Sequence, residues 1–155
     1  MQLGEQLLFF LAGLGVFNGF LLAIYCSIVI RPRRWVNFLF AFLLLALCIR
    51  VGKSIIHSFY DLDRIWRQIG LSTCMLIGPL LFTYIRSLKN NQPAPRKSDL
   101  ANLMLPLFGI LTIGFLWPYE LYPDEWNSWI VQSIYVVWSG YTLMTISLIW
   151  PLIKK

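Results

Sequence analysis

Three basic side chains recur along one short stretch of the sequence, where their types and spacing could bind an anion. Arg50, Lys53 and His57 follow one another at intervals of three and four residues, and this spacing puts them on one face of a helix. Neighbouring positive charges repel one another unless an anion or water meets them. The stripe therefore indicates a site for an anionic or polar ligand, and His57 could alternatively relay protons.

A structural interpretation of the same stripe stays open. Arg50 lies about 22 Å along a helix from Trp35, short of the roughly 30 Å that a membrane core measures. Long basic side chains near the end of a span can reach the lipid headgroups, and carboxylates could pair with them. The acidic residues expected at this end of the protein are Asp61, Asp63, Glu120, Asp124 and Glu125.

Two glycine motifs point to close packing of helices. Gly15 and Gly19 form a GxxxG motif with Asn18 inside it, which predicts packing within the chain, a dimer contact or a ligand role for Asn18. Gly78 and Pro79 interrupt another apolar stretch. Because proline removes a backbone donor and clashes with the preceding turn, we expect a bend there, held by contact with another helix.

Residues for catalysis or metal binding do not form a pattern in this sequence. It has one histidine, and the three cysteines (Cys26, Cys48 and Cys74) lie inside apolar runs without metal-ligand spacing. Nucleophile elbows, phosphate-binding loops and paired carboxylates are missing as well. The sequence therefore predicts no catalytic residues, no metal site and no cofactor.

The composition indicates an integral membrane protein. Hydrophobic residues make up 58% and charged residues 13% of the 155 residues, against about 45–50% and about 25% in soluble domains. A spanning helix needs about 20 mostly apolar residues. We therefore expect one all-α membrane domain over residues 1–155, with five spans at approximately 7–30, 35–56, 69–85, 100–117 and 128–149.

The charges between the spans predict an orientation. With the N-terminus outside and the C-terminus inside, nine of the thirteen lysines and arginines are cytoplasmic, and six of the seven acidic residues are external. This bias follows the positive-inside rule. Residues 60–69 predict an amphipathic helical lead-in to the third span, and Pro123 and Asp124 suggest that Asp124 caps the last helix.

Several segments together resemble a known family. They are LAGLGVFNGFLLAIY, the basic turn, RWVNFLFAFLLLALCIRVGKS, NLMLPLFGIL, WPYE and, most specifically, IGPLLFTYIRSL at residues 77–88. The chain resembles the membrane-embedded N-terminal region of bacterial AraC-type transcriptional regulators. The resemblance implies a bacterial inner-membrane location and a signal passed to the cytoplasm. The sequence has no helix-turn-helix, so direct nucleic-acid binding by this chain is not expected.

These observations leave several functional hypotheses open. The first is a sensory or signalling module that acts on a cytoplasmic protein partner, with a homodimer as a further possibility. The others are a structural or non-functional remnant of a truncated regulator, a small transporter or channel subunit, and a membrane enzyme, which no motif supports. In each case the lipid bilayer is a partner. The basic loops are explained by topology alone, and they could also bind anionic lipid headgroups.

Overall fold

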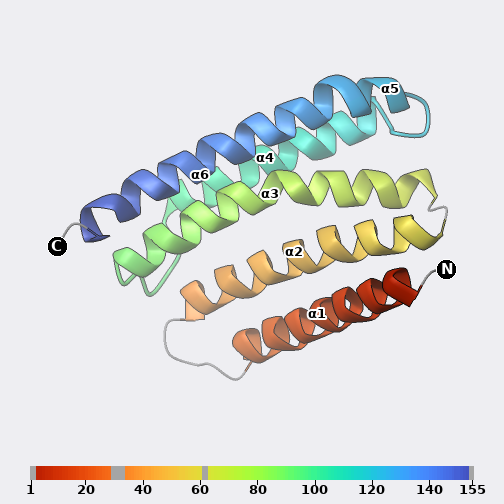
Figure 1. Cartoon of the computed structure of the whole chain (residues 1–155). Helices are drawn as coiled ribbons and strands as arrows, with labels where there is room; N and C mark the ends of the chain where they lie inside the picture. The colour runs from red at the N-terminus through yellow and green to blue at the C-terminus, as the bar shows by residue number, and fades with distance from the viewer. Residues whose placement is uncertain (1–2, 29–33, 61–62, 154–155) are drawn as a thin grey trace.

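The computed structural model describes residues 3–28, 34–60 and 63–153, which form a bundle of long helices (Figure 1). Its elements are α1 (Leu3–Ile28), α2 (Arg34–Phe59), α3 (Arg64–Lys89), α4 (Lys97–Leu116), α5 (Pro123–Glu125), the π-helical turn η1 (Trp126–Ile130) and α6 (Val131–Ile153). No strand occurs within these described ranges. The expected all-α class is therefore confirmed.

Five segments of the bundle are long and apolar enough to cross a membrane, as predicted. They are Gln6–Ile28, Arg34–Phe59, Arg64–Lys89, Lys97–Leu116 and Pro123–Pro151. A helix of 26 residues, the length of α1, α2 and α3, is about 39 Å long, which exceeds a membrane core of about 30 Å. The apolar residues that the bundle leaves exposed, such as Phe115, suit contact with lipid.

The helix boundaries differ from the predicted spans mainly at the polar ends. Helix α3 begins at Arg64, because the expected lead-in continues into the span as one helix. Tyr122 is the N-cap of α5 and Pro123 its first residue, so the predicted capping role of Asp124 is wrong. Proline suits that first position because the N–H it lacks would have no helical partner.

Some predicted features lie outside the described residues. They are the end of the first span at residues 29–30, the basic turn at 31–33, Asp61, and the terminal Lys154 and Lys155.

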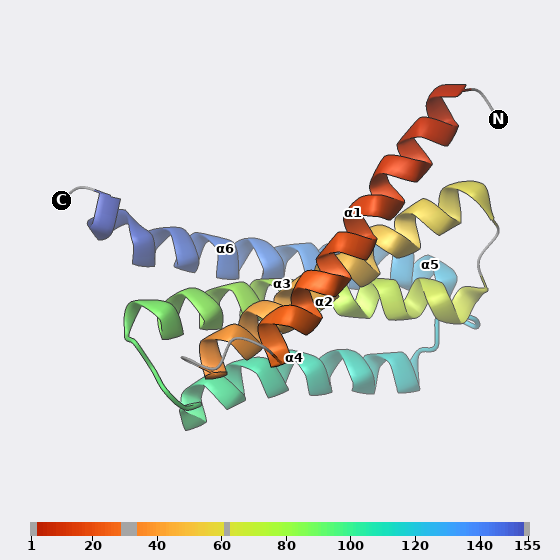
Figure 2. The same cartoon turned by 90° about the horizontal axis from the view of Figure 1, so that it is seen from below.

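Helix α3 is the centre of the bundle. It contacts α2, α4 and α6, whereas α1 contacts only α2 among the described helices. Figure 1 shows α1, α2 and α3 in succession, and in Figure 2 α3 lies between α4 and α6. The start of α1 and the end of α6 lie at opposite ends of the bundle. A change in the position of α3 would therefore alter its contacts with three other helices.

Apolar contacts join the helices in three clusters. Leu39, Leu43 and Ala46 of α2 pack with Leu80 of α3. A second cluster joins α4 to the segment that leads into α6, and its buried members are Ile110, Tyr119, Trp126 and Ile134. The third cluster joins α1 and α2 through Ala23, Cys26 and Ala41. Small side chains in this last cluster let the two helices approach closely.

The Gly78–Pro79 pair lies where α3 meets α6. Both residues are buried, and Figure 1 shows that α3 changes direction near its middle. A Cβ atom added to Gly78 would lie 3.1 Å from Cβ of Tyr141 and 3.2 Å from Cα of Trp138. Helix α6 thus packs directly against the proline-containing part of α3, and a side chain at Gly78 would require α6 to shift.

Candidate anion site between helices α2 and α3

Two residues of the predicted basic stripe lie together where α2 faces α3. Lys53 is close enough to Arg50 for charge repulsion, and Arg67 of α3 adds a third positive charge. The Arg50 side chain also lies beside Cys74 of α3 and Tyr135 of α6, and its guanidinium donates a hydrogen bond to the Ser54 hydroxyl. Parts of three helices therefore surround this group of cations.

A glycine in α3 gives Lys53 its position. A Cβ atom at Gly70 would lie 2.5 Å from Cδ and 2.9 Å from Cγ of Lys53, so the methylene stem of the lysine crosses the space that a side chain would fill. Gly70 is buried, whereas Lys53 is half-buried. The lysine stem thus packs against the α3 backbone, while its ammonium group stays near the two arginines.

Carboxylates do not neutralise the two α2 cations within the described part of the chain. The cations next to Lys53 are Arg50 and Arg67, and the Cys74 thiol lies nearby. Beside Arg50 lie the Cys74 thiol and the Tyr135 hydroxyl. Of the expected acidic partners, Glu120 meets the basic residue Arg64, through its backbone oxygen. Because Arg50 and Lys53 repel each other and no described carboxylate pairs with them, an external anion bound between them would be stabilised by both charges.

The other two candidate ligand-binding residues lie apart from the cations. His57 is exposed one turn further along α2, and Asn18 is exposed on α1. Neither side chain has a hydrogen bond to another described residue. The structure therefore brings together Arg50 and Lys53 but does not add His57 or Asn18 to them.

The two glycines of the GxxxG motif face different surroundings. A Cβ atom at Gly19 would lie 2.6 Å from Sγ of Cys48, whereas one at Gly15 would meet nothing within 4 Å. The Cys48 thiol also donates a hydrogen bond of 3.5 Å to the carbonyl of Val16. Gly19 therefore serves the contact between α1 and α2, and Gly15 lies on the open side of α1 together with Asn18.

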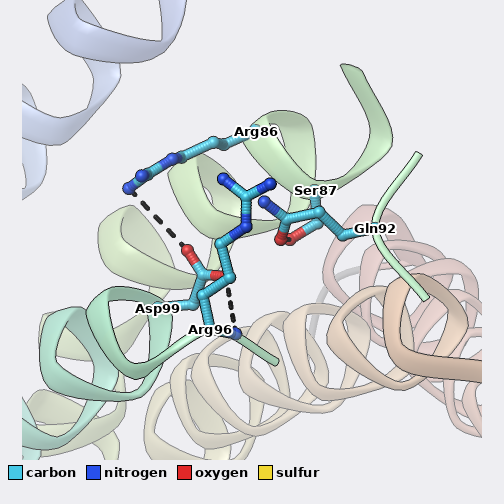
Figure 3. A network of polar contacts seen from close by, with 5 residues as sticks. All are labelled: Arg86, Ser87, Gln92, Arg96 and Asp99. Carbon is cyan, nitrogen blue, oxygen red and sulfur yellow. Dashed lines mark hydrogen bonds and ion pairs between the residues drawn. The ribbon is translucent and has the colours of Figure 1, made fainter. Parts of the chain in front are cut away.

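A second polar cluster closes the opposite end of α3, where the chain turns into α4 (Figure 3). Asp99 is fully buried, and its Oδ1 lies 3.7 Å from Nη1 of Arg86. The backbone N–H of Arg96 donates to Oδ2 of Asp99 at 3.2 Å. One carboxylate thus ties the last turn of α3 to the first turn of α4.

Gln92 completes this cluster. With its amide nitrogen toward Asp99, Gln92 donates to Oδ2 at 2.9 Å and to the Ser87 hydroxyl at 3.2 Å, while its oxygen accepts from Nε of Arg96 at 3.0 Å. Asn91 before it has a φ of 49°, a left-handed conformation that asparagine tolerates better than most residues. The tight turn brings Gln92 back over α3 and buries it.

The end of α3 near the cations is also tied to its neighbours. Gln68 accepts a hydrogen bond of 3.0 Å from the N–H of Tyr119 and donates one of 3.1 Å to the carbonyl of Gly114. These bonds hold the connection between α4 and α5 against α3. Both ends of α3 are therefore linked by polar contacts to other elements.

Sequence reasoning missed the partners that come from distant segments. Arg67, Cys74 and Tyr135 join Arg50 and Lys53 only through folding, and no spacing rule connects them. Asp99 did give a signal, because it is the one acidic residue in the basic loop between the third and fourth spans. An isolated carboxylate among cations could have been recognised as an ion-pair partner.

Comparison of the chain with protein families, curated proteins and solved structures gives no match. Among the described residues, no group of three histidine, cysteine or acidic side chains could hold a metal ion.

Proposed function

We propose that this chain is a membrane signalling module, in which an anionic ligand near Arg50 and Lys53 alters the position of α3. The observation that carries this proposal is the placement of α3. One end of the helix packs under Lys53, its middle contacts α6 at Gly78, and its other end forms the Arg86–Asp99 ion pair. The same helix therefore meets a charged site and the segment that leads to the C-terminus.

The route from the ligand to α6 has two contacts. Gly78 of α3 lies against Trp138 and Tyr141, and the Lys89 ammonium donates a hydrogen bond of 3.2 Å to the carbonyl of Leu148. Because close-packed helices transmit displacement, movement of α3 would shift α6. A cytoplasmic protein partner bound at the end of α6 would respond to that shift.

The proposed orientation puts the N-terminus outside the cell and the C-terminus in the cytoplasm. Its support is the charge bias of the sequence, in which the connection between α3 and α4 is basic and the one between α4 and α5 is acidic. We propose the bacterial inner membrane as the location, with the resemblance of residues 77–88 to membrane-bound AraC-type regulators as the support.

We also propose that two copies associate through the open side of α1. Gly15 is exposed there without a neighbour within 4 Å, and Asn18 is exposed nearby. An unpaired amide in hydrocarbon is costly, and an asparagine amide can pair with a second copy of itself because it has both donors and an acceptor. The contact would place the two α1 helices against each other.

A reporter fusion tests the signalling proposal. An enzymatic output domain attached after Lys155 would be assayed in cells exposed to peptides, sugars and lipids. We expect one stimulus to change the output, and the Arg50→Ala variant to lose that response while its membrane level stays unchanged. The Lys97→Ala variant, which changes an exposed cation elsewhere, should respond like the original protein. A flat response to every stimulus would reject the proposal.

A further inference from the structure

An apolar groove runs beside the cations and has Lys53 in its wall. It has a volume of about 730 Å³ and lies over α2 between α1 and the start of α3. Val16, Phe17 and Phe20 of α1 form one side, and Trp66 and Gly70 of α3 lie on the other. Among the described lining residues, Lys53 is the only charged one, so the groove offers a hydrocarbon surface beside a positive group.

The length of the groove suits one leaflet of a membrane. Along α2 its lining residues extend from Leu45 to Ile56, which is about 17 Å at the rise of an α-helix. Half of a membrane core is about 15 Å. Lys53 lies about 12 Å beyond Leu45 along the helix axis, toward the end of α2. An acyl chain could therefore fill the groove while its headgroup meets the lysine.

The charges near Lys53 favour a negative headgroup. Arg50 and Arg67 are close enough to repel the lysine, and no described carboxylate pairs with Arg50 or Lys53. A phosphodiester accepts hydrogen bonds from both ammonium and guanidinium groups. A zwitterionic lipid would bring a positive group into the same place, which the surrounding cations disfavour.

We propose that this groove binds a phospholipid with an anionic headgroup, whose acyl chain lies between α1 and α3 and whose phosphate meets Lys53 and the neighbouring arginines. The inference gives a chemical class to the ligand of the signalling site, and in that respect it rests on the proposed function. Binding itself needs no signalling output and can be measured separately.

Native mass spectrometry of the detergent-solubilised protein tests the inference. The protein would be exposed to equal amounts of phosphatidylglycerol and phosphatidylcholine, and the lipids retained would be counted. We expect a preference for phosphatidylglycerol that falls about fivefold in the Lys53→Gln variant, the effect of about one surface charge near an anionic lipid. The Lys97→Gln variant should keep the preference of the original protein. An equal preference in the original and Lys53→Gln proteins would overturn the proposal.

A second pair of variants tests the groove without changing a charge. A side chain at Gly13 would enter the groove, where a Cβ atom meets nothing within 4 Å, and Gly4 of the same helix is equally open but does not line it. Gly13→Phe should reduce retention of both lipids, whereas Gly4→Phe should not. Unchanged retention in Gly13→Phe, or displacement of the lipid by inorganic phosphate alone, would contradict a lipid groove.

The binding assay and the reporter fusion separate the two proposals. Retention of phosphatidylglycerol with a flat reporter would reject the signalling function and support the lipid site. A reporter response that depends on Arg50, without preferential retention of phosphatidylglycerol, would reject the lipid site and support signalling by another anion.

Discussion

Asp99 is the side chain on which the connection between α3 and α4 depends. It is fully buried and meets three groups: the Arg86 guanidinium, the Arg96 N–H and the Gln92 amide. Removing one member of a buried polar cluster leaves the others without partners, which costs more than the hydrogen bond itself contributes. Asp99 therefore contributes to the stability of the connection between α3 and α4.

We expect Asp99→Ala to lower the free energy of unfolding by about 1–3 kcal/mol, because the buried Gln92 amide and the Arg96 N–H lose their acceptor. The measurement is unfolding in detergent micelles. Glu120→Ala is the matched control, since that side chain is exposed, and it should change stability by less than about 0.5 kcal/mol. Equal stability of the two variants would show that the Asp99 cluster does not hold α3 to α4.

Helix α3 depends on close contact with α6 at Gly78. A Cβ atom at Gly78 would lie 3.2 Å from Cα of Trp138, so the α6 backbone would have to shift, whereas a Cβ atom at Gly109 of α4 meets nothing within 4 Å. The two glycines therefore form a matched pair, of which one is enclosed and the other open. The comparison separates the effect of packing from the general effect of replacing a helical glycine.

Gly78→Val should destabilise the protein by about 1–3 kcal/mol, the usual cost of forcing extra volume into a packed contact. Gly109→Val should stay within about 0.5 kcal/mol of the original protein. Unfolding of both variants in mixed micelles gives the comparison. If Gly78→Val unfolds like Gly109→Val, α6 is free to move away from α3 and the packing argument is wrong.

The proposed dimer contact through α1 can be tested by a substitution at Gly15. Gly15→Ile should convert the proposed dimer to a monomer, because a branched side chain would keep two α1 helices apart. The mass of the protein–detergent complex, measured by light scattering, reports the change. Gly140→Ile, which alters an equally open glycine on α6, should remain dimeric. A Gly15→Ile protein that is still dimeric would eliminate α1 as the interface.

In the molecule as a whole, the five helices that are long and apolar enough to cross a membrane could be predicted, because a run of about 20 mostly apolar residues is visible directly in the sequence. The neighbours of each helix could not be predicted. The contact between Gly70 of α3 and Lys53 of α2, for example, depends on how the surfaces of two helices fit together, which the sequence does not reveal. The helical start of α3 was predicted from the spacing of Ile65, Trp66 and Ile69, and α3 begins at Arg64. The turn at Asn91 and Gln92 could not be predicted, because it depends on buried hydrogen bonds.

The orientation of the molecule gives a separate prediction. Single cysteines at Ala94 and Leu121, both exposed in connections at opposite ends of the bundle, would be introduced into a protein whose native cysteines are replaced by alanine. An impermeant maleimide should label Leu121→Cys in intact cells, and Ala94→Cys only after the membrane is opened, because the proposed orientation places the basic connection inside. The opposite labelling pattern would invert the proposed topology.

If an anionic lipid binds near Lys53 as proposed, it changes how the far end of α3 packs against α6. Spin labels at Ala94→Cys and Ile146→Cys, in the alanine-replaced background, measure this distance in lipid nanodiscs. We predict that phosphatidylglycerol shifts the distance by about 1–2 Å, a typical helix displacement, relative to phosphatidylcholine, and that Lys53→Gln abolishes the shift. Identical distance distributions in the two lipids, with phosphatidylglycerol shown to be bound, would contradict the claim.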